Sequence, residues 1–163
     1  MELSVRLVTW NCCSGPLARK LAALEELDAD IAVIPECPEL PRSSGTFWLG
    51  TNRHKGLGVF SFGDVRLTRA RPFDPRSEVF LPLSVTGPRC FNLLAVWSLN
   101  FHPSAGLSMP DARRFYRSFL ARQEAVVAGD FNNSVFWDRP GKRTNFAGIA
   151  HSLASLGLAS AYH

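Results

Sequence analysis

The chain has 163 residues, of which 46% are hydrophobic and 20% are charged, so it is long enough for one packed core and too short for two ordinary domains. No apolar stretch approaches the roughly 20 residues of a membrane span, and the N-terminus lacks the charged start and long apolar core of a secretory signal. We therefore expect a single cytoplasmic domain over residues 1–163, with no membrane partner. The net charge of +4 permits a polyanionic partner but does not demand one.

The first elements are expected to be a strand, a helix and a second strand. Residues Leu3 to Trp10 are mostly apolar and favour a strand, which the segment from Asn11 to Gly15 ends. Between Leu17 and Leu27 leucines recur at helical spacing, which predicts an amphipathic helix that covers a sheet. The run from Ile31 to Ile34 predicts a short buried strand that Pro35 ends.

The middle of the chain carries short β-favouring runs separated by glycine and proline, a spacing that predicts antiparallel pairing. These runs are Thr46 to Leu49, Leu57 to Phe62, Val65 to Arg69, Val79 to Val85 and Phe91 to Trp97.

The last third of the chain is expected to contain two helices and one strand. A helix over Asp111 to Arg122 would turn Phe115, Phe119 and Leu120 inward. Strands and helices in this order predict an α/β fold of two sheets packed face to face, with helices outside. The remaining elements are expected to be a strand over Val126 to Ala128, a long loop over residues 131–145 and a helix over Phe146 to Leu156.

Four cysteines are present, and none of them has the spacing of a zinc site. Free cysteine is among the most buried residue types, so we expect small buried thiols in a reducing compartment. The four are Cys12, Cys13, Cys37 and Cys90.

Polar side chains follow three of the apolar strands, at the strand ends where ligands usually bind. Asn11 follows the first strand, Glu36 the second, and Asp130 and Asn132 the run that ends at Ala128. Each residue taken alone is more typical of a turn or cap. A carboxylate there is costly unless it is solvated, hydrogen-bonded or metal-bound. Because Mg²⁺ is commonly held by one or two carboxylates and several waters, Glu36 and Asp130 are a candidate metal pair.

The order of these motifs resembles the endonuclease/exonuclease/phosphatase superfamily, which includes DNase I-like nucleases, abasic-site endonucleases and phosphoinositide phosphatases. The resemblance covers nearly the whole chain and implies a DNase I-like four-layer sandwich. It also implies phosphoester hydrolysis that depends on Mg²⁺ or Mn²⁺. The matching segments are VTWNCCSG, the helix containing Lys20, DADIAVIPEC, KGLGVFS, FNLLAVWS, VVAGDFNNSVFWD and HSLASLGLASAYH.

The resemblance implies a role for each residue of the polar set. Glu36 resembles the family's metal-binding glutamate, and Asn11 resembles the asparagine that supports that metal site. Asp130 and Asn132 resemble the pair that orients the attacking water and contacts the scissile phosphate. A metal ion then acts as a Lewis acid, while a carboxylate orients or deprotonates the water.

The family pattern continues to further strands, an aspartate and a terminal SDH, whereas this sequence ends at His163 and contains no SDH. We therefore expect a sandwich that is incomplete at its C-terminal side. A second departure lies after the central strand, where many relatives place a histidine or tyrosine and this chain reads Val96-Trp97-Ser98. His102, four residues beyond Ser98, is a candidate catalytic residue, the alternative being an exposed loop residue. An uncovered sheet edge would favour a homodimer or a complementing subunit.

Basic and aromatic residues are candidates for substrate binding. Arginines can follow a phosphodiester backbone and Trp137 can stack on a base; the alternatives are a solvated charged face and an anchored loop aromatic. We expect a nuclease of low sequence specificity acting on DNA or RNA. A phosphatase on a small substrate and an inactive member that binds nucleic acid or protein stay open. The candidates are Arg113, Arg114 and Arg117 on one helix, and Trp137, Lys142 and Arg143 in the loop after Asp130.

Overall fold

Two four-stranded sheets form the centre of the computed structural model, which describes residues 4–41, 43, 45–74, 77, 79–98, 109–141 and 145–161. The strand pairs at one end of each sheet, β1–β2 and β7–β8, are parallel, and the other pairs are antiparallel. The first sheet has the order β1 (Leu7–Thr9), β2 (Ile31–Cys37), β4 (Lys55–Ser61) and β3 (Thr46–Asn52). The second has the order β5 (Arg66–Arg69), β6 (Phe80–Thr86), β7 (Phe91–Trp97) and β8 (Ala125–Asp130).

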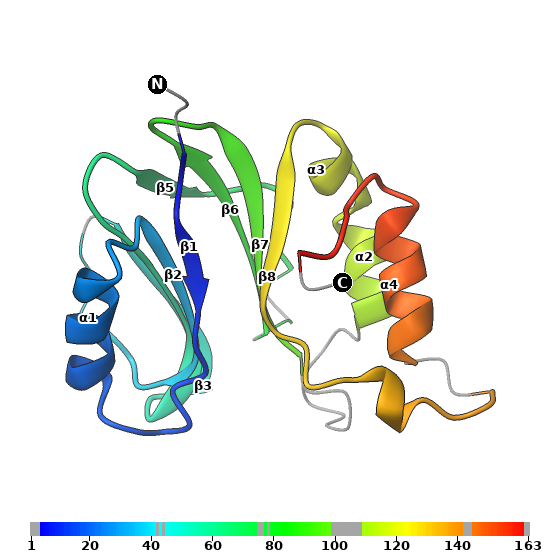
Figure 1. Cartoon of the computed structure of the whole chain (residues 1–163), viewed down its shortest axis with the longest axis horizontal. Coiled ribbons are helices and arrows are strands. Elements are labelled where there is room, and N and C mark those ends of the chain that lie inside the picture. The colour runs from blue at the N-terminus through cyan, green and yellow to red at the C-terminus, as the bar shows by residue number, and fades with distance from the viewer. Residues whose placement is uncertain are drawn as a thin grey trace.

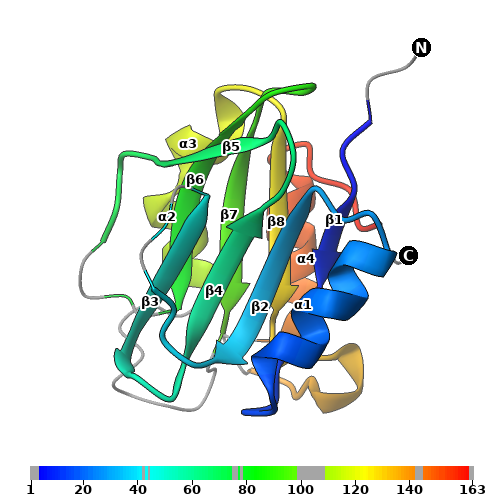
Figure 2. The same cartoon turned by 90° about the vertical axis from the view of Figure 1, so that its left-hand side faces the viewer.

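Helices cover the outer faces of both sheets, which gives four layers (Figure 1). Helix α1 (Leu17–Glu26) lies outside the first sheet, and Figure 2 shows it in front of β1 and β2. Helices α2 (Met109–Phe115), α3 (Arg117–Ala121) and α4 (Phe146–Ala154) lie outside the second sheet. The expected α/β sandwich of two sheets with outer helices is therefore confirmed. No helix in the described ranges is long and apolar enough to cross a bilayer.

Strand β2 is buried on both faces, which explains its continuous apolar sequence. Ile31 and Val33 belong to the core between the two sheets, whereas Ala32 and Ile34 pack on the side of α1. This alternation is the two-residue period of a strand. Leu24 of α1 is fully buried in the same cluster as Ile34, so the helix covers the sheet as expected.

Strand β2 does not end at Pro35, as the sequence predicts, but continues to Cys37. Proline lacks only the N–H donor, and its carbonyl is used here: it accepts a hydrogen bond of 2.7 Å from the backbone N–H of Cys12. The strand therefore stays paired beyond the proline, and Glu36 lies within it.

The helix predicted over Asp111 to Arg122 is broken at Tyr116 into α2 and α3. Tyr116 is fully buried, and its hydroxyl accepts a hydrogen bond of 3.4 Å from the backbone N–H of Asp74. Phe115, the last residue of α2, is 38% exposed, so its predicted inward position is wrong. Phe119 is buried as expected.

Strands β1 and β8 bring distant parts of the chain together. They are the terminal strands of their sheets and contact each other across the sandwich. Both strands end at the lower side of Figure 1. The loops that follow them therefore meet at one end of the molecule.

Candidate active site

The loop after β1 is joined to the end of β8 by the side chain of Asn11. Its amide nitrogen donates a hydrogen bond of 2.8 Å to Oδ2 of Asp130. Its amide oxygen accepts a hydrogen bond of 2.7 Å from the backbone N–H of Cys13. Because that N–H requires an oxygen acceptor, the amide has one orientation, with its NH₂ group toward the carboxylate.

Both carboxylate oxygens of Asp130 have a donor. Oδ1 accepts a hydrogen bond of 2.8 Å from the backbone N–H of Asn132, while Oδ2 accepts the one from Asn11. The preceding Gly129 has a φ of 138°, and a Cβ on it would lie 1.9 Å from the carbonyl oxygen of Val96. Only glycine fits there. The carboxylate is thus held in one orientation, and each oxygen keeps a lone pair for water or a cation.

Glu36 lies where the β2 register shifts, between Pro35 and Cys37. Its backbone carbonyl accepts a hydrogen bond of 3.3 Å from the N–H of Ser14, which ties it to the loop that carries Asn11. Its side chain is 18% exposed and forms an ion pair of 3.2 Å with Nζ of Lys55. The carboxylate is therefore half-buried, but its charge is balanced.

Backbone strain concentrates in this region. Among the described residues five that are not glycine have a positive φ: Cys13, Ser14, Asp28, Glu36 and Asn132. All of these except Asp28 lie in the loops and strand end just described. Such conformations are uncommon outside glycine and cost about 1–3 kcal/mol each, and they persist where the surrounding structure enforces them, as at functional sites.

Two lysines flank the carboxylates, and the sequence analysis assigned no role to either. Lys55 contacts Glu36 and also lies 5.5 Å from the centre of the Trp97 ring. Lys20 donates a hydrogen bond of 3.2 Å to the backbone carbonyl of Asn11 and lies 4.0 Å from the centre of the Trp10 ring. Both lysines lie in segments that resemble the superfamily: Lys55 opens KGLGVFS, and Lys20 lies in the first helix. Their place in these segments was the sequence feature that could have pointed to them.

The side chains present fit a hard divalent cation. Glu36 offers a carboxylate, and Asp130 a second one with free lone pairs. Among the described residues no group of three or more histidine, cysteine, aspartate and glutamate side chains gathers into a metal cluster. A small set of oxygen donors suits Mg²⁺, which keeps several waters, better than Zn²⁺, which takes nitrogen and sulfur ligands. Asn11 supports this set mainly through Asp130, because its amide nitrogen faces the carboxylate.

The arginines predicted to bind substrate lie on the outer helices. Arg113 packs against α4: its guanidinium donates to the carbonyl of Ser152 at 3.4 Å and to Oγ of Ser155 at 3.5 Å. Arg114 and Arg117 are exposed. The predicted residues His102, Lys142 and Arg143 lie outside the described residues.

The loop after Asp130 presents aromatic side chains to solvent. A short 3₁₀ helix, η2 (Val135–Trp137), exposes 92% of Phe136 and 57% of Trp137. The loop is anchored by Asp138, whose carboxylate accepts hydrogen bonds from the backbone N–H groups of Phe146 at 2.6 Å and Ala147 at 3.0 Å. The aromatic residues are therefore exposed on an anchored turn, and sequence reasoning found Trp137 but missed Phe136.

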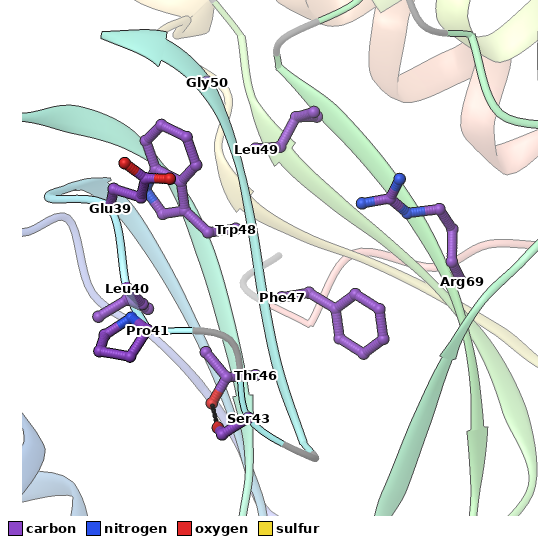
Figure 3. A pocket seen from close by; sticks show the side chains of 10 residues that line it. All are labelled: Glu39, Leu40, Pro41, Ser43, Thr46, Phe47, Trp48, Leu49, Gly50 and Arg69. Atoms are coloured by element: carbon purple, nitrogen blue, oxygen red, sulfur yellow. Dashed lines mark hydrogen bonds between the residues drawn. The ribbon is translucent and has the colours of Figure 1, made fainter. Parts of the chain in front are cut away.

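A cavity of about 600 Å³ lies apart from the carboxylates, along β3. Figure 3 shows Phe47 and Trp48 projecting to opposite sides of this strand, with Arg69 of β5 across from Phe47. Neither Glu36 nor Asp130 lines it. It is therefore separate from the candidate active site.

The four cysteines are free thiols in two different environments. Cys12 and Cys37 are buried as expected, whereas Cys13 and Cys90 are exposed, so the prediction is wrong for these two. Cys13 lies in a turn, and Cys90 directly precedes β7. Burial raises the pKa of the Cys37 thiol to about 12 and also raises the pKa of Cys12. Neither buried thiol supplies a thiolate nucleophile at neutral pH.

No known protein-family model matches the sequence, and no curated protein matches it. Solved structures do. The endonuclease domain of TRAS1, a telomere-specific non-LTR retrotransposon, superposes with a TM-score of 0.68 at 18% identity, over 94% of this chain and 71% of that one.

Two structures of D. rerio TDP2 are also similar. A humanized form has a TM-score of 0.55 at 16% identity, over 96% of this chain and 68% of that one. A complex with a single-strand DNA product has a TM-score of 0.50 at 15% identity, over 96% of this chain and 66% of that one. These structures are members of one superfamily. The resemblance seen in the sequence is thus confirmed at the level of fold: the chain has the DNase I-like fold of the endonuclease/exonuclease/phosphatase superfamily.

Proposed function

We propose that this chain hydrolyses phosphodiester bonds in DNA or RNA, with low sequence specificity and with Mg²⁺ or Mn²⁺ as cofactor. The observation that carries the proposal is the hydrogen bond between Asn11 and Asp130, which holds a carboxylate close to the loop tied to Glu36. The likeness to a retrotransposon endonuclease domain supports the same chemistry.

Each residue has a separate task in this proposal. Glu36 holds the divalent cation, which when bound supplies positive charge for the phosphate in the transition state. Asp130 orients the attacking water and accepts its proton. Asn132 donates a hydrogen bond to the scissile phosphate, and Asn11 keeps Asp130 in place. His102 is the candidate for a second proton-transfer group.

Nucleic acid is the proposed substrate because the chain is basic and because exposed aromatic side chains follow Asp130 in the sequence. The chain carries a net charge of +4, and exposed Arg114 and Arg117 can contact phosphates. Trp137 and Phe136 offer stacking surfaces, with Lys142 and Arg143 following in the same loop. The complex of TDP2 with a single-strand DNA product supports the same class of substrate.

The direct test is incubation of the purified protein with plasmid, single-stranded DNA and RNA in Mg²⁺, Mn²⁺ or EDTA. We expect cleavage that EDTA abolishes, and Glu36→Gln should remove most of it while the circular dichroism spectrum stays unchanged. Asp130→Asn, purified in the same way, controls for a contaminating nuclease. Equal cleavage by the wild type and Asp130→Asn, or full activity of Glu36→Gln, would contradict the proposal.

A further inference from the structure

Lys55 stands between two groups of the candidate active site. Its ammonium lies 3.2 Å from Oε2 of Glu36 and 5.5 Å from the centre of the Trp97 ring. Lys55 is the first residue of β4, which pairs with β2 where Glu36 leaves the regular register. The side chain is 40% exposed, so it has room to move away from the carboxylate.

Trp97 is a second contact of the ammonium, alongside Glu36. It lies opposite Asp130 across the parallel β7–β8 pair and is 6% exposed. Its indole N–H is buried and has no acceptor within the described part of the chain. A cation near the face of a desolvated indole is stabilised by the ring quadrupole. An ammonium that leaves Glu36 can therefore stay beside the strand that carries Asp130.

We propose that Lys55 is the resident counter-ion of Glu36, which it leaves when a divalent cation binds, and that it then pairs with the phosphate of the substrate. This inference rests on the proposed function, because it takes Glu36 as the metal ligand. Lys55 and a divalent cation compete for the same carboxylate, since each needs close contact with its oxygens. Once Lys55 is released, its charge attracts an anion instead, and the phosphate is the anion that arrives.

The first test is a calorimetric titration with Mn²⁺. Lys55→Met should bind Mn²⁺ roughly two- to fivefold more tightly than the wild type, the range expected when a partly exposed ion pair is removed. Lys55→Arg keeps the competing charge and should bind as the wild type does. Arg53→Met is the matched control, because Arg53 pairs with Glu39 at 2.6 Å in the turn beside Lys55. Equal tightening in Arg53→Met and Lys55→Met, or no tightening in Lys55→Met, would overturn the inference.

The second test is hydrolysis of a single-stranded oligonucleotide at saturating Mn²⁺. Loss of a charged hydrogen bond to phosphate should lower kcat/KM of Lys55→Met roughly 10- to 100-fold, and Lys55→Arg should recover most of the rate. The two measurements thus change in opposite directions, tighter metal binding with slower turnover, which a lysine that only stabilises the fold would not produce. Unchanged kcat/KM in Lys55→Met would refute the phosphate contact.

The two proposals can fail separately. If the wild type hydrolyses no substrate, the proposed function fails, and the Mn²⁺ titrations alone decide whether Lys55 is the counter-ion of Glu36. If Glu36→Gln binds Mn²⁺ as tightly as the wild type, no metal is held at Glu36, and the inference about Lys55 is wrong.

Discussion

The side-chain amide of Asn11 and the carboxylate of Asp130 form a hydrogen bond of 2.8 Å across a separation of 119 residues. Asn11 follows the terminal strand of the first sheet, and Asp130 ends the terminal strand of the second. The orientation of the proposed catalytic carboxylate therefore depends on how the two sheets pack. The site exists only when the sandwich is assembled.

Replacement of Asn11 should slow catalysis more than it destabilises the fold. Asn11→Ala frees Oδ2 of Asp130, and misplacement of a catalytic group by about 1 Å can cost roughly 10²-fold in rate. The free energy of unfolding should fall by only about 1 kcal/mol, the usual effect of one hydrogen bond. Steady-state kinetics and urea titrations measure the two effects. Asn11→Asp should be slower still, because it adds a like charge beside Asp130. If either variant keeps the kcat/KM of the wild type, the hydrogen bond between Asn11 and Asp130 has no catalytic role.

Gly129 should not tolerate alanine. A Cβ there would lie 1.9 Å from the backbone oxygen of Val96, and the φ of 138° is outside the range of other residues. Gly129→Ala must therefore separate β7 from β8 and displace Asp130, with a loss of stability of several kcal/mol or failure to fold. Gly148→Ala is the matched control: Gly148 lies in α4, and apart from its chain neighbours and the backbone of that helix no described atom lies within 4 Å of the added Cβ. Thermal unfolding should show that variant to be more stable by about 0.5–1 kcal/mol, and a Gly129→Ala protein as stable as the wild type would refute this account of the turn.

The sequence was sufficient to identify the sandwich and the residues at its strand ends. Continuous apolar runs such as Ile31 to Ile34 reveal a strand buried on both faces, and the polar residues that follow such runs stand out. Asn11, Glu36 and Asp130 were visible for this reason, since each interrupts an apolar pattern.

The contacts between strands were not visible, because periodicity carries no information on register. The ion pair of Lys55 with Glu36 depends on the antiparallel register of β2 and β4 and on the shift near Pro35. The break at Tyr116 was missed for a similar reason: helical spacing continues through it, and periodicity does not reveal that the tyrosine contacts Asp74, which is distant in sequence.

The aromatic turn after Asp130 should contribute to binding and not to stability. Phe136 is 92% exposed and Trp137 is 57% exposed, so Phe136→Ala and Trp137→Ala should leave the melting temperature almost unchanged. If a base stacks on either ring, binding of a single-stranded oligonucleotide should weaken by about 1–3 kcal/mol. Fluorescence anisotropy measures this loss. Asp138→Ala should weaken binding indirectly and also cost about 1 kcal/mol of stability, because it removes the acceptor for two N–H groups of α4. If Phe136→Ala and Trp137→Ala both bind the oligonucleotide as tightly as the wild type, no base stacks on either ring.

Strand β8 is a candidate surface for self-association. Among the described residues it pairs only with β7, its Val126 is 37% exposed, and an apolar cavity of about 410 Å³ adjoins it. Unpaired strand edges with apolar side chains favour pairing with another chain, and lysine on such an edge prevents it. Light scattering over a dilution series should show a dimer that Val126→Lys shifts to monomer. A wild-type protein that stays monomeric at high concentration would show that this edge does not associate.

The buried thiol of Cys37 should make the protein less stable in alkali. Its pKa is raised from 9.0 to about 12, mainly because burial disfavours the thiolate. Between these two pH values the folded chain keeps a proton that the unfolded chain releases. Stability is therefore fully present below about pH 9 and falls as the pH rises toward 12, by at most about 1.4 kcal/mol per pH unit for one proton.

Urea titrations at pH 7, 9 and 10.5 separate this effect from others. Cys37→Ala should lower stability at pH 7, because it removes a buried side chain, yet lose less stability between pH 9 and pH 10.5 than the wild type does. Cys90→Ala is the control, because it removes an exposed thiol and leaves the buried Cys37 in place. The buried Tyr116, whose pKa is also raised by burial, would leave a residual slope in both variants. If stability falls equally with pH in Cys37→Ala and in the wild type, the thiol at the end of β2 is not the group that titrates. The packing of Cys37 beside Gly58 would then have no part in the alkaline loss of stability.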